Sequence, residues 1–251
     1  MMKYALLLAA TLTLFSLGAN AEQTVRLMAN TSPPYADQKL PEQGLAVELV
    51  KLVFSRTDYQ PDITIENWSR AVEGARLGVY DGLAAAWYSE DRDRDLLFSE
   101  PYLGSDLVIL KLRTDTRRFE RLEDLAGLRL GVRTDYAYGV DFGAIRDLQL
   151  VEENHLVQNL LNLLNERVDA VIGDRRTVIY ELNEYLKDRL NSFAVTPIPL
   201  PTRERHVAVS RSFAGHEQVV AAFNRALAQA RKDGSLDAII KRWDERLGAL
   251  D

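Results

Sequence analysis

The sequence predicts an α/β fold with parallel strands and crossover helices, and two observations favour it. Short runs of aliphatic and β-branched residues alternate with longer stretches whose apolar residues recur at helical spacing. A segment of the first half is also echoed in the second half. Alternation of this kind is typical of helices packed on a largely parallel sheet.

The first half is expected to contribute three strands and two helices. Leu45, Leu49, Val50 and Val53 recur at helical spacing, which predicts the first helix. In chain order the expected elements are a strand at 24–28, an irregular loop at 32–35, a helix at 45–54, a strand at 62–65, a helix through 71–77 and a buried strand at 82–86.

The second half repeats the alternation and ends in helices. Its expected elements are strands at 107–112 and 128–132, a helix at 156–164, a strand at 168–172, a helix at 177–186, a strand at 207–210, and helices at 216–231 and 236–247. Pro197, Pro199 and Pro201 indicate a stiff, extended connection before the last strand.

The echo joins residues 75–84 and 164–173. In each segment a helix end is followed by a turn and a buried strand, with Asp81 or Asp169 in the turn. Coincidence between two common helix-to-strand turns would explain one such match. Because the alternating pattern surrounds both copies, we expect two lobes of similar topology.

Residues 1–21 have the features of a secretory signal peptide. Lys3 is followed by an apolar run at 5–17 and by Ala19-Asn20-Ala21, an A-x-A cleavage pattern. The apolar run is too short to span a bilayer, so we expect cleavage after Ala21 and a periplasmic protein.

Composition excludes several classes of function. The chain has no cysteine, so disulfides, thiolate catalysis and a lipidated cysteine anchor are excluded. The formal net charge is −6, and loss of Lys3 with the signal peptide would make it −7. An acidic, well-mixed surface argues against nucleic-acid binding. The absence of a long exposed apolar stripe favours a monomer.

Motifs for catalysis, metals and cofactors are missing from the sequence. His155, His206 and His216 lie far apart and lack metal-ligand spacing. No P-loop, G-x-G-x-x-G or G-x-S-x-G pattern occurs. We therefore expect neither a metal nor a cofactor, and a protein that is not an enzyme.

The most informative segment is 87–102. Ser89 is a suitable helix N-cap, which would place Arg92 in the first turn beside backbone N–H groups. A guanidinium beside such donors suits a carboxylate ligand. The alternative is that Arg92, like Arg94, pairs with neighbouring acids on a solvated helix, and spacing alone favours that alternative.

The whole chain after residue 21 resembles the bacterial extracellular solute-binding proteins of family 3. The matching segments occur in family order, and they are Pro33-Pro34-Tyr35, 44–49, 78–82, Glu90-Asp91-Arg92 with 98–102, 125–132, 168–174, and Gly234-Ser235-Leu236 with Trp243. Each match is weak alone, but seven in order are specific.

The resemblance implies a two-lobed periplasmic-binding-protein fold of type II, with the ligand cleft between the lobes. The first lobe would comprise residues 22–106 and 209–251, and the second lobe residues 107–208. Such lobes close on a ligand by hinge bending, and clefts between lobes are favoured ligand sites.

The resemblance also implies the roles of individual residues. Arg92 would hold the carboxylate of an amino acid, and Asp174 of the opposite lobe would hold its α-amino group. Tyr35 and Trp68 would stack on the ligand side chain, with core packing as an equal alternative. Arg70 would add a charge facing the cleft.

The chain departs from the family pattern around these anchors. Ala84, Ala85 and Trp87 stand where amino-acid-binding members usually carry small hydroxyl residues. Tyr136 and Tyr138 fill the turn that usually carries paired threonines. Trp87 and the two tyrosines are therefore expected to line an altered pocket, whose ligand is an amino acid or a related small carboxylate.

Three functions remain open at this point. The first is capture of a solute for the permease of an ABC importer, and the second is ligand sensing for a sensor kinase. The third is an enzyme similar to cyclohexadienyl dehydratase, which uses the same fold and would need an acid such as Asp135 or Glu48 in the cleft.

Overall fold

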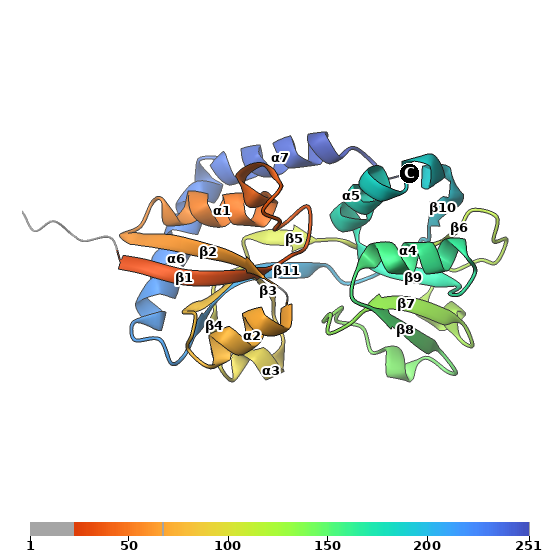
Figure 1. The fold of residues 1–251 in the computed structure, drawn as a ribbon, viewed down its shortest axis with the longest axis horizontal. Helices are drawn as coiled ribbons and strands as arrows, with labels where there is room; N and C mark the ends of the chain where they lie inside the picture. The colour runs from red at the N-terminus through yellow and green to blue at the C-terminus, as the bar shows by residue number, and fades with distance from the viewer. Residues whose placement is uncertain (1–22, 67, 251) are drawn as a thin grey trace, which may run out of the picture.

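The computed structural model describes residues 23–66 and 68–250, apart from the side chains of Trp68, Ser69 and Val72. These residues form two lobes, each built around its own sheet, with extended connections between them (Figure 1). The predicted α/β class is therefore confirmed. The predicted signal peptide at 1–21 lies outside the described residues.

The sheet of the first lobe has the order β2-β1-β3-β11-β4, and β5 also pairs with β11. Strand β1 runs parallel to β2 and β3, whereas β11 runs antiparallel to β3, β4 and β5. The strands are β1 (Gln23–Asn30), β2 (Tyr59–Glu66), β3 (Gly82–Trp87), β4 (Leu96–Phe98), β5 (Leu103–Ser105) and β11 (Arg203–Ser210).

Helices cover both faces of this sheet (Figure 1). They are α1 (Leu45–Phe54), α2 (Trp68–Arg76), α3 (Glu90–Asp93), α6 (His216–Lys232) and α7 (Ser235–Leu247), with a 3-10 turn η1 (Pro41–Gln43). Alternation along the strands divides the core, because successive side chains point to opposite faces. Leu27 and Val209 pack with α1 and α6, whereas Met28 and Ala208 pack with α2. Full burial of a Leu, Val or Met side chain stabilises the fold by about 1.5–3 kcal/mol.

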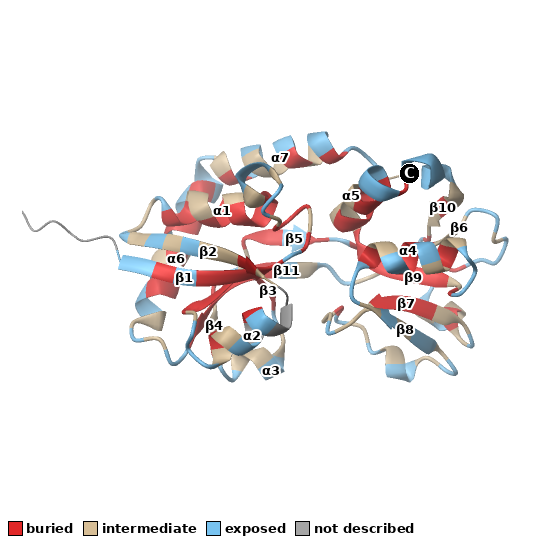
Figure 2. Ribbon diagram, in the orientation of Figure 1, coloured by how far each residue is buried: buried red, intermediate tan, exposed pale blue. Residues whose placement is uncertain are grey.

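The sheet of the second lobe has the order β10-β6-β9-β7-β8. Strand β7 runs parallel to β8 and β9, whereas β6 runs antiparallel to β9 and β10. The elements are β6 (Leu107–Leu112), β7 (Arg129–Arg133), β8 (Gln149–Glu153), β9 (Ala170–Asp174), β10 (Phe193–Val195), α4 (Leu156–Leu164), α5 (Arg175–Tyr185) and the 3-10 turns η2 (Leu122–Leu125), η3 (Phe142–Ala144) and η4 (Lys187–Ser192). In both lobes the central strands are the most deeply buried elements (Figure 2).

Two connections cross between the lobes, one from β5 to β6 and one from β10 to β11. The lobe boundary expected at residue 208 falls inside β11, and all of β11 pairs in the first sheet. Reading only residues 207–210 as a strand placed this boundary too late. Strand β11 begins with the charged residues Arg203, Glu204 and Arg205, which do not show the apolar pattern expected of a buried strand.

The C-terminal helix α7 also contacts the second lobe. Two nitrogens of the Arg176 guanidinium donate to Asp244 of α7: Nε lies 2.6 Å from Oδ1 and Nη2 lies 3.0 Å from Oδ2. Asn183 Nδ2 donates to the carbonyl of Leu247 at 3.0 Å. A bidentate Arg–carboxylate pair is among the stronger charge-assisted contacts, so α7 ties α5 to the first lobe.

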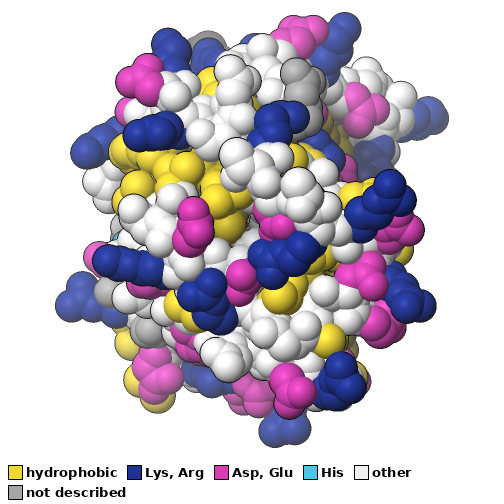
Figure 3. All heavy atoms as spheres, turned by 90° about the vertical axis from the view of Figure 1, so that its right-hand side faces the viewer, with side chains coloured by type: hydrophobic (Ala, Val, Ile, Leu, Met, Phe, Trp, Pro, Cys, Tyr) yellow, Lys and Arg dark blue, Asp and Glu magenta, His cyan; other side chains and the backbone are white. Residues whose placement is uncertain are grey.

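The end of the second lobe is covered by interspersed positive and negative side chains, with apolar side chains between them (Figure 3). Within the part of the chain that the structure describes, none of the helices has the length and apolar character needed to span a membrane.

Candidate functional site

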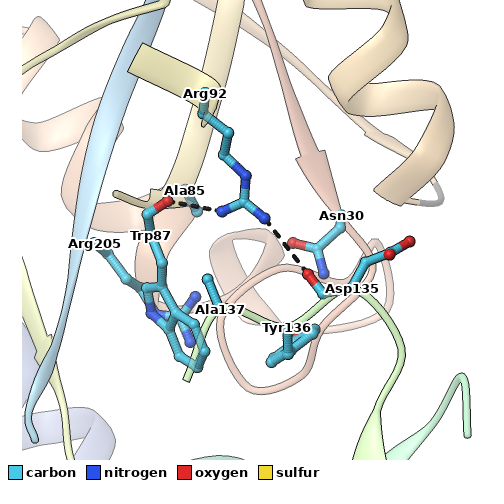
Figure 4. Close-up of a pocket in the computed structure, with 8 residues that line it drawn as sticks. All are labelled: Asn30, Ala85, Trp87, Arg92, Asp135, Tyr136, Ala137 and Arg205. Carbon is cyan, nitrogen blue, oxygen red and sulfur yellow. Dashed lines mark hydrogen bonds between the residues drawn. The ribbon is translucent and has the colours of Figure 1, made fainter. Parts of the chain in front are cut away.

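A small cavity lies where the two lobes meet (Figure 4). Its volume is about 20 Å³, which is room for roughly one water molecule. Its lining comes from the ends of first-lobe strands, from α3, and from the loop after β7 in the second lobe. The lining residues are Asn30, Ala85, Trp87, Arg92, Asp135, Tyr136, Ala137 and Arg205.

Arg92 crosses from the first lobe to the second. Ser89 caps α3 as predicted, and its Oγ accepts a hydrogen bond from the backbone N–H of Arg92 at 3.4 Å. The Arg92 guanidinium donates to the carbonyl of Trp87 at 2.7 Å and to the carbonyl of Asp135 at 3.5 Å (Figure 4). The side chain is therefore not simply part of a solvated helix surface.

The environment of Arg92 is unfavourable to its positive charge. Burial lowers the pKa of the Arg92 guanidinium, and the charges of Arg76 and Arg203 lower it further. An anion placed beside this guanidinium would relieve both effects, because an opposite charge favours the ionised form.

A second guanidinium, that of Arg205, lies at the same cavity and was missed by the sequence analysis. Arg205 is in β11, and its side chain is only 6% exposed. Its Nη2 lies 3.7 Å from Oδ2 of Asp174, and its Cζ lies 3.5 Å from the centre of the Tyr35 ring. The sequence around Arg205 offers one indication of this role: a charged residue precedes the apolar part of a strand.

Asp174 ends β9 and caps α5. Its Oδ1 accepts hydrogen bonds from the backbone N–H of Thr177 at 3.1 Å and from the hydroxyl of Tyr35 at 2.6 Å. Burial and the neighbouring Asp174 carboxylate both raise the pKa of the Tyr35 phenol, so this phenol stays protonated and donates. Tyr35 and Asp174 thus join the lobes through a buried contact.

The loop after β7 carries the two tyrosines that the sequence singled out. The Tyr136 ring meets Trp87 edge-on with 5.2 Å between ring centres. Its hydroxyl lies 3.3 Å from Oγ of Ser32 and also contacts Arg133. Tyr138 is buried behind it, where its hydroxyl accepts from the backbone N–H of Arg133 at 2.9 Å. The pocket is therefore filled with aromatic bulk.

The structure brings most of the expected site residues to one place, but in different roles. Arg92, Trp87 and Tyr136 line the cavity. Tyr35, Asp174 and Tyr138 are buried, and the described part of the cavity wall does not include them. The Tyr35 ring is covered by Arg205, whose guanidinium therefore occupies the face on which a ligand was expected to stack.

One expected residue, Arg70, lies elsewhere. Arg70 is largely exposed, and its Nη1 lies 3.6 Å from Glu66 Oε2 of the preceding strand. The side chain of Trp68 lies outside the described residues, so its expected stacking stays a prediction. Asn30 and Ala137 line the cavity without having been singled out from the sequence.

The acids that an enzyme would need are placed unfavourably. Glu48 lies on α1 and contacts α7, where its Oε2 accepts from Nε1 of Trp243 at 2.8 Å. Asp135 is exposed at a positive φ of 60°, and its carboxylate points away from the cavity (Figure 4). Among the described residues, no group of three or more His, Cys, Asp or Glu side chains could hold a metal ion.

A second cavity, of about 200 Å³, also lies between the lobes. Residues of the first-lobe loop after β1 form one wall, and Arg133, His155 and Glu181 are on the opposite wall. Glu181 is buried, and its Oε2 lacks a hydrogen-bond partner among the described residues. Burial raises the pKa of this carboxyl from 4.5 to about 7, although Arg133 acts in the opposite direction.

Comparison with known proteins gives a consistent result. The family model described as bacterial extracellular solute-binding proteins, family 3, matches residues 25–246. A probable histidine-binding protein of Campylobacter jejuni is 25% identical over 235 residues, which cover 89% of this chain and 87% of that protein.

Solved structures share the fold. An ancestral arginine-binding protein bound to arginine superposes with a TM-score of 0.73 at 20% identity, covering 89% of this chain and 99% of that one. A histidine kinase sensor domain with similarity to periplasmic binding proteins gives a TM-score of 0.73 at 23% identity, covering 89% and 97%. The predicted two-lobed fold of type II is thereby confirmed.

Proposed function

Because the chain belongs to the bacterial extracellular solute-binding proteins, family 3, we propose that it captures an amino acid or a related small carboxylate between its lobes. The observation that carries this proposal is the position of Arg92, which reaches from the first lobe to the backbone of the second at the edge of a shared cavity. Similar proteins named for histidine and arginine binding support the same ligand class.

Capture would proceed by separation and closure of the lobes. When they separate, the contact between Arg92 and the Asp135 carbonyl breaks, and the guanidinium faces solvent. A ligand carboxylate can then accept two hydrogen bonds from the fork of Arg92. Closure around the ligand follows from its higher affinity for the closed state, and the closed form is delivered to the permease of an ABC importer.

The proposed location is the periplasm. Removal of residues 1–21 would release the chain there, and the family description as extracellular supports this. The protein is expected to act as a monomer, because its cleft is completed by the two lobes of one chain.

The test is a thermal-shift screen of protein that has been unfolded and refolded to remove bound solutes. A ligand at a hundredfold excess over its dissociation constant should stabilise the protein by about 2.7 kcal/mol. Arg92→Met should abolish the shift. Arg94→Met is the matched control, since Arg94 lies two residues away and its side chain is 78% exposed. An equal loss in both variants, or no shift with any amino acid or carboxylate, would contradict the proposal.

Ligand sensing is the second candidate, and the similarity to a histidine kinase sensor domain favours it. The two candidates share the same capture chemistry and differ in the partner. Crosslinking of the ligand-bound protein in cell envelopes would distinguish them. Capture of a permease supports transport, whereas capture of a membrane kinase supports sensing.

A further inference from the structure

Positive charge predominates over negative charge at the first cavity. Two guanidiniums, those of Arg92 and Arg205, line it. The nearest buried carboxylate, Asp174, lies 3.7 Å from Arg205 through Oδ2 and accepts hydrogen bonds through Oδ1 from Tyr35 and Thr177. The chain therefore supplies its own counter-charge to Asp174.

Arg205 is held firmly in this position. Its backbone pairs with Trp87 of β3 on one side and with Leu103 of β5 on the other. Its guanidinium lies against the Tyr35 ring at 3.5 Å and near the Trp87 ring at 5.3 Å. A cation held over a buried aromatic ring is stabilised by attraction to the face of the ring. The Arg205 side chain is thus fixed on the first lobe, and it faces Asp174 whenever the lobes close.

The other carboxylate at the cavity offers no alternative partner for a ligand cation. Asp135 lines the cavity, but its carboxylate points outward and its residue is exposed (Figure 4). An incoming ammonium group would meet two guanidiniums and would lose its hydration. Uncompensated burial of a charge and like-charge contact are both unfavourable.

Unused hydrogen-bonding groups at the cavity point to an acceptor ligand. Among the described residues, Nε of Arg205 and Nε1 of Trp87 are buried donors without a hydrogen-bond partner. Both residues line the cavity. Oδ2 of Asp174 is a buried acceptor without one, but it faces the Arg205 cation at 3.7 Å and Asp174 is not among the residues that line the cavity. An ionised carboxylate has only acceptor sites and can serve several donors at once.

We propose that the ligand is a small carboxylate without an ammonium group, and that its carboxylate lies between Arg92 and Arg205. This inference depends on the proposed function and narrows it. Arg205 becomes the residue that determines specificity, since it neutralises Asp174 and adds a second positive charge to the site.

The experiment uses calorimetric titration of the refolded protein with matched pairs of compounds. Each pair differs only in an α-amino group: glutarate against L-glutamate, and 4-methylpentanoate against L-leucine. Where either compound of a pair binds, the compound without the amino group should bind more tightly than its amino-acid partner, by at least about tenfold. Tighter binding of the amino acid would overturn this inference and leave the proposed function intact. Failure of every amino acid and carboxylate to bind would overturn both.

Variants at residue 205 test whether Arg205 causes the preference for a ligand without an ammonium group. Arg205→Met leaves Asp174 without its cation, so the preference should shift by about tenfold or more toward the amino acid. Arg205→Lys retains the charge and should retain the preference, which keeps the test informative if Arg205→Met does not fold. Arg225→Met, at an exposed position of α6, is the control. An unchanged preference in Arg205→Met, or a loss of preference in Arg205→Lys, would contradict the role of Arg205.

Discussion

Asp81 in the first lobe and Asp169 in the second occupy the same place in their sheets. Asp81 accepts from the backbone N–H of Arg26 at 2.8 Å, and Asp169 accepts from that of Arg129 at 2.9 Å. Each aspartate also receives a hydrogen bond from the side chain of the same arginine. The matching strand orders β2-β1-β3-β11 and β8-β7-β9-β6 extend this likeness to both sheets.

The opposite ends of the same strands differ sharply between the lobes. Beyond β3 and in β11 the first lobe places Arg92 and Arg205. In the second lobe Asp174 ends β9 and Tyr136 lies beyond β7. The aspartate–arginine arrangement thus lies within each sheet. At the facing ends, by contrast, Arg205 and Asp174 carry opposite charges that come together only when the lobes meet.

The largest effect on stability is expected at the contact between Arg205 and Asp174, which joins the facing ends of the two sheets. Arg205→Met should lower the free energy of unfolding by about 3–5 kcal/mol, because it leaves the buried Asp174 charge uncompensated. Urea unfolding followed by circular dichroism measures the change. The double variant Arg205→Met/Asp174→Asn should recover most of the loss. If Arg205→Met is as stable as the control Arg225→Met, at an exposed position of α6, Arg205 and Asp174 do not stabilise one another.

A smaller effect is expected at the repeated arrangement itself. Asp81→Ala should cost about 3 kcal/mol and Asp169→Ala about 2 kcal/mol, since hydrogen bonds to charged groups are worth about 1.5–3 kcal/mol each and Asp81 is more deeply buried. Hydrogen exchange should show faster opening only in the sheet that carries the substitution. Loosening of both sheets by either variant would mean that the lobes do not fold as separate units.

The smallest effect concerns pH at the second cavity between the lobes. Glu181 has its pKa raised from 4.5 to about 7, so the folded protein binds this proton more tightly than the unfolded chain does. Its contribution is fully present below pH 4.5 and is lost as the pH rises through 7.

We therefore expect the stability of the protein to fall by about 2 kcal/mol between pH 5 and pH 8 through this group. Glu181→Gln should remove that part of the pH dependence, whereas Glu184→Gln, on the exposed side of the same helix, should retain it. If stability depends on pH in the same way in the unsubstituted protein, Glu181→Gln and Glu184→Gln, another group causes the pH dependence.

Much of the fold could be predicted because strong periodic patterns specify it. Helices α1 and α4 begin and end at the predicted residues, since each presents a continuous apolar face. Strand β8 was not predicted, because it is largely exposed and lacks an alternating apolar pattern. The matching contacts of Asp81 with Arg26 and of Asp169 with Arg129 were indicated in the sequence only by the similarity of residues 75–84 and 164–173.

The site was predicted less completely, for a physical reason. Arg92 follows a helix cap that local sequence can indicate. Arg205 acquires its role only through a partner at the end of a strand in the other lobe. Periodicity in β11 would place an apolar side chain at that position, so the buried pair with Asp174 emerges only from the assembled fold.

The small size of the first cavity has a kinetic consequence. Room for about one water molecule means that a ligand can enter only while the lobes are apart. In a stopped-flow experiment the observed binding rate should rise with ligand concentration and then level off at the rate of opening. The apparent dissociation constant would exceed the intrinsic one in inverse proportion to the fraction of molecules that are open. Contacts such as Arg176 with Asp244, far from the ligand, would therefore tune affinity by setting that fraction.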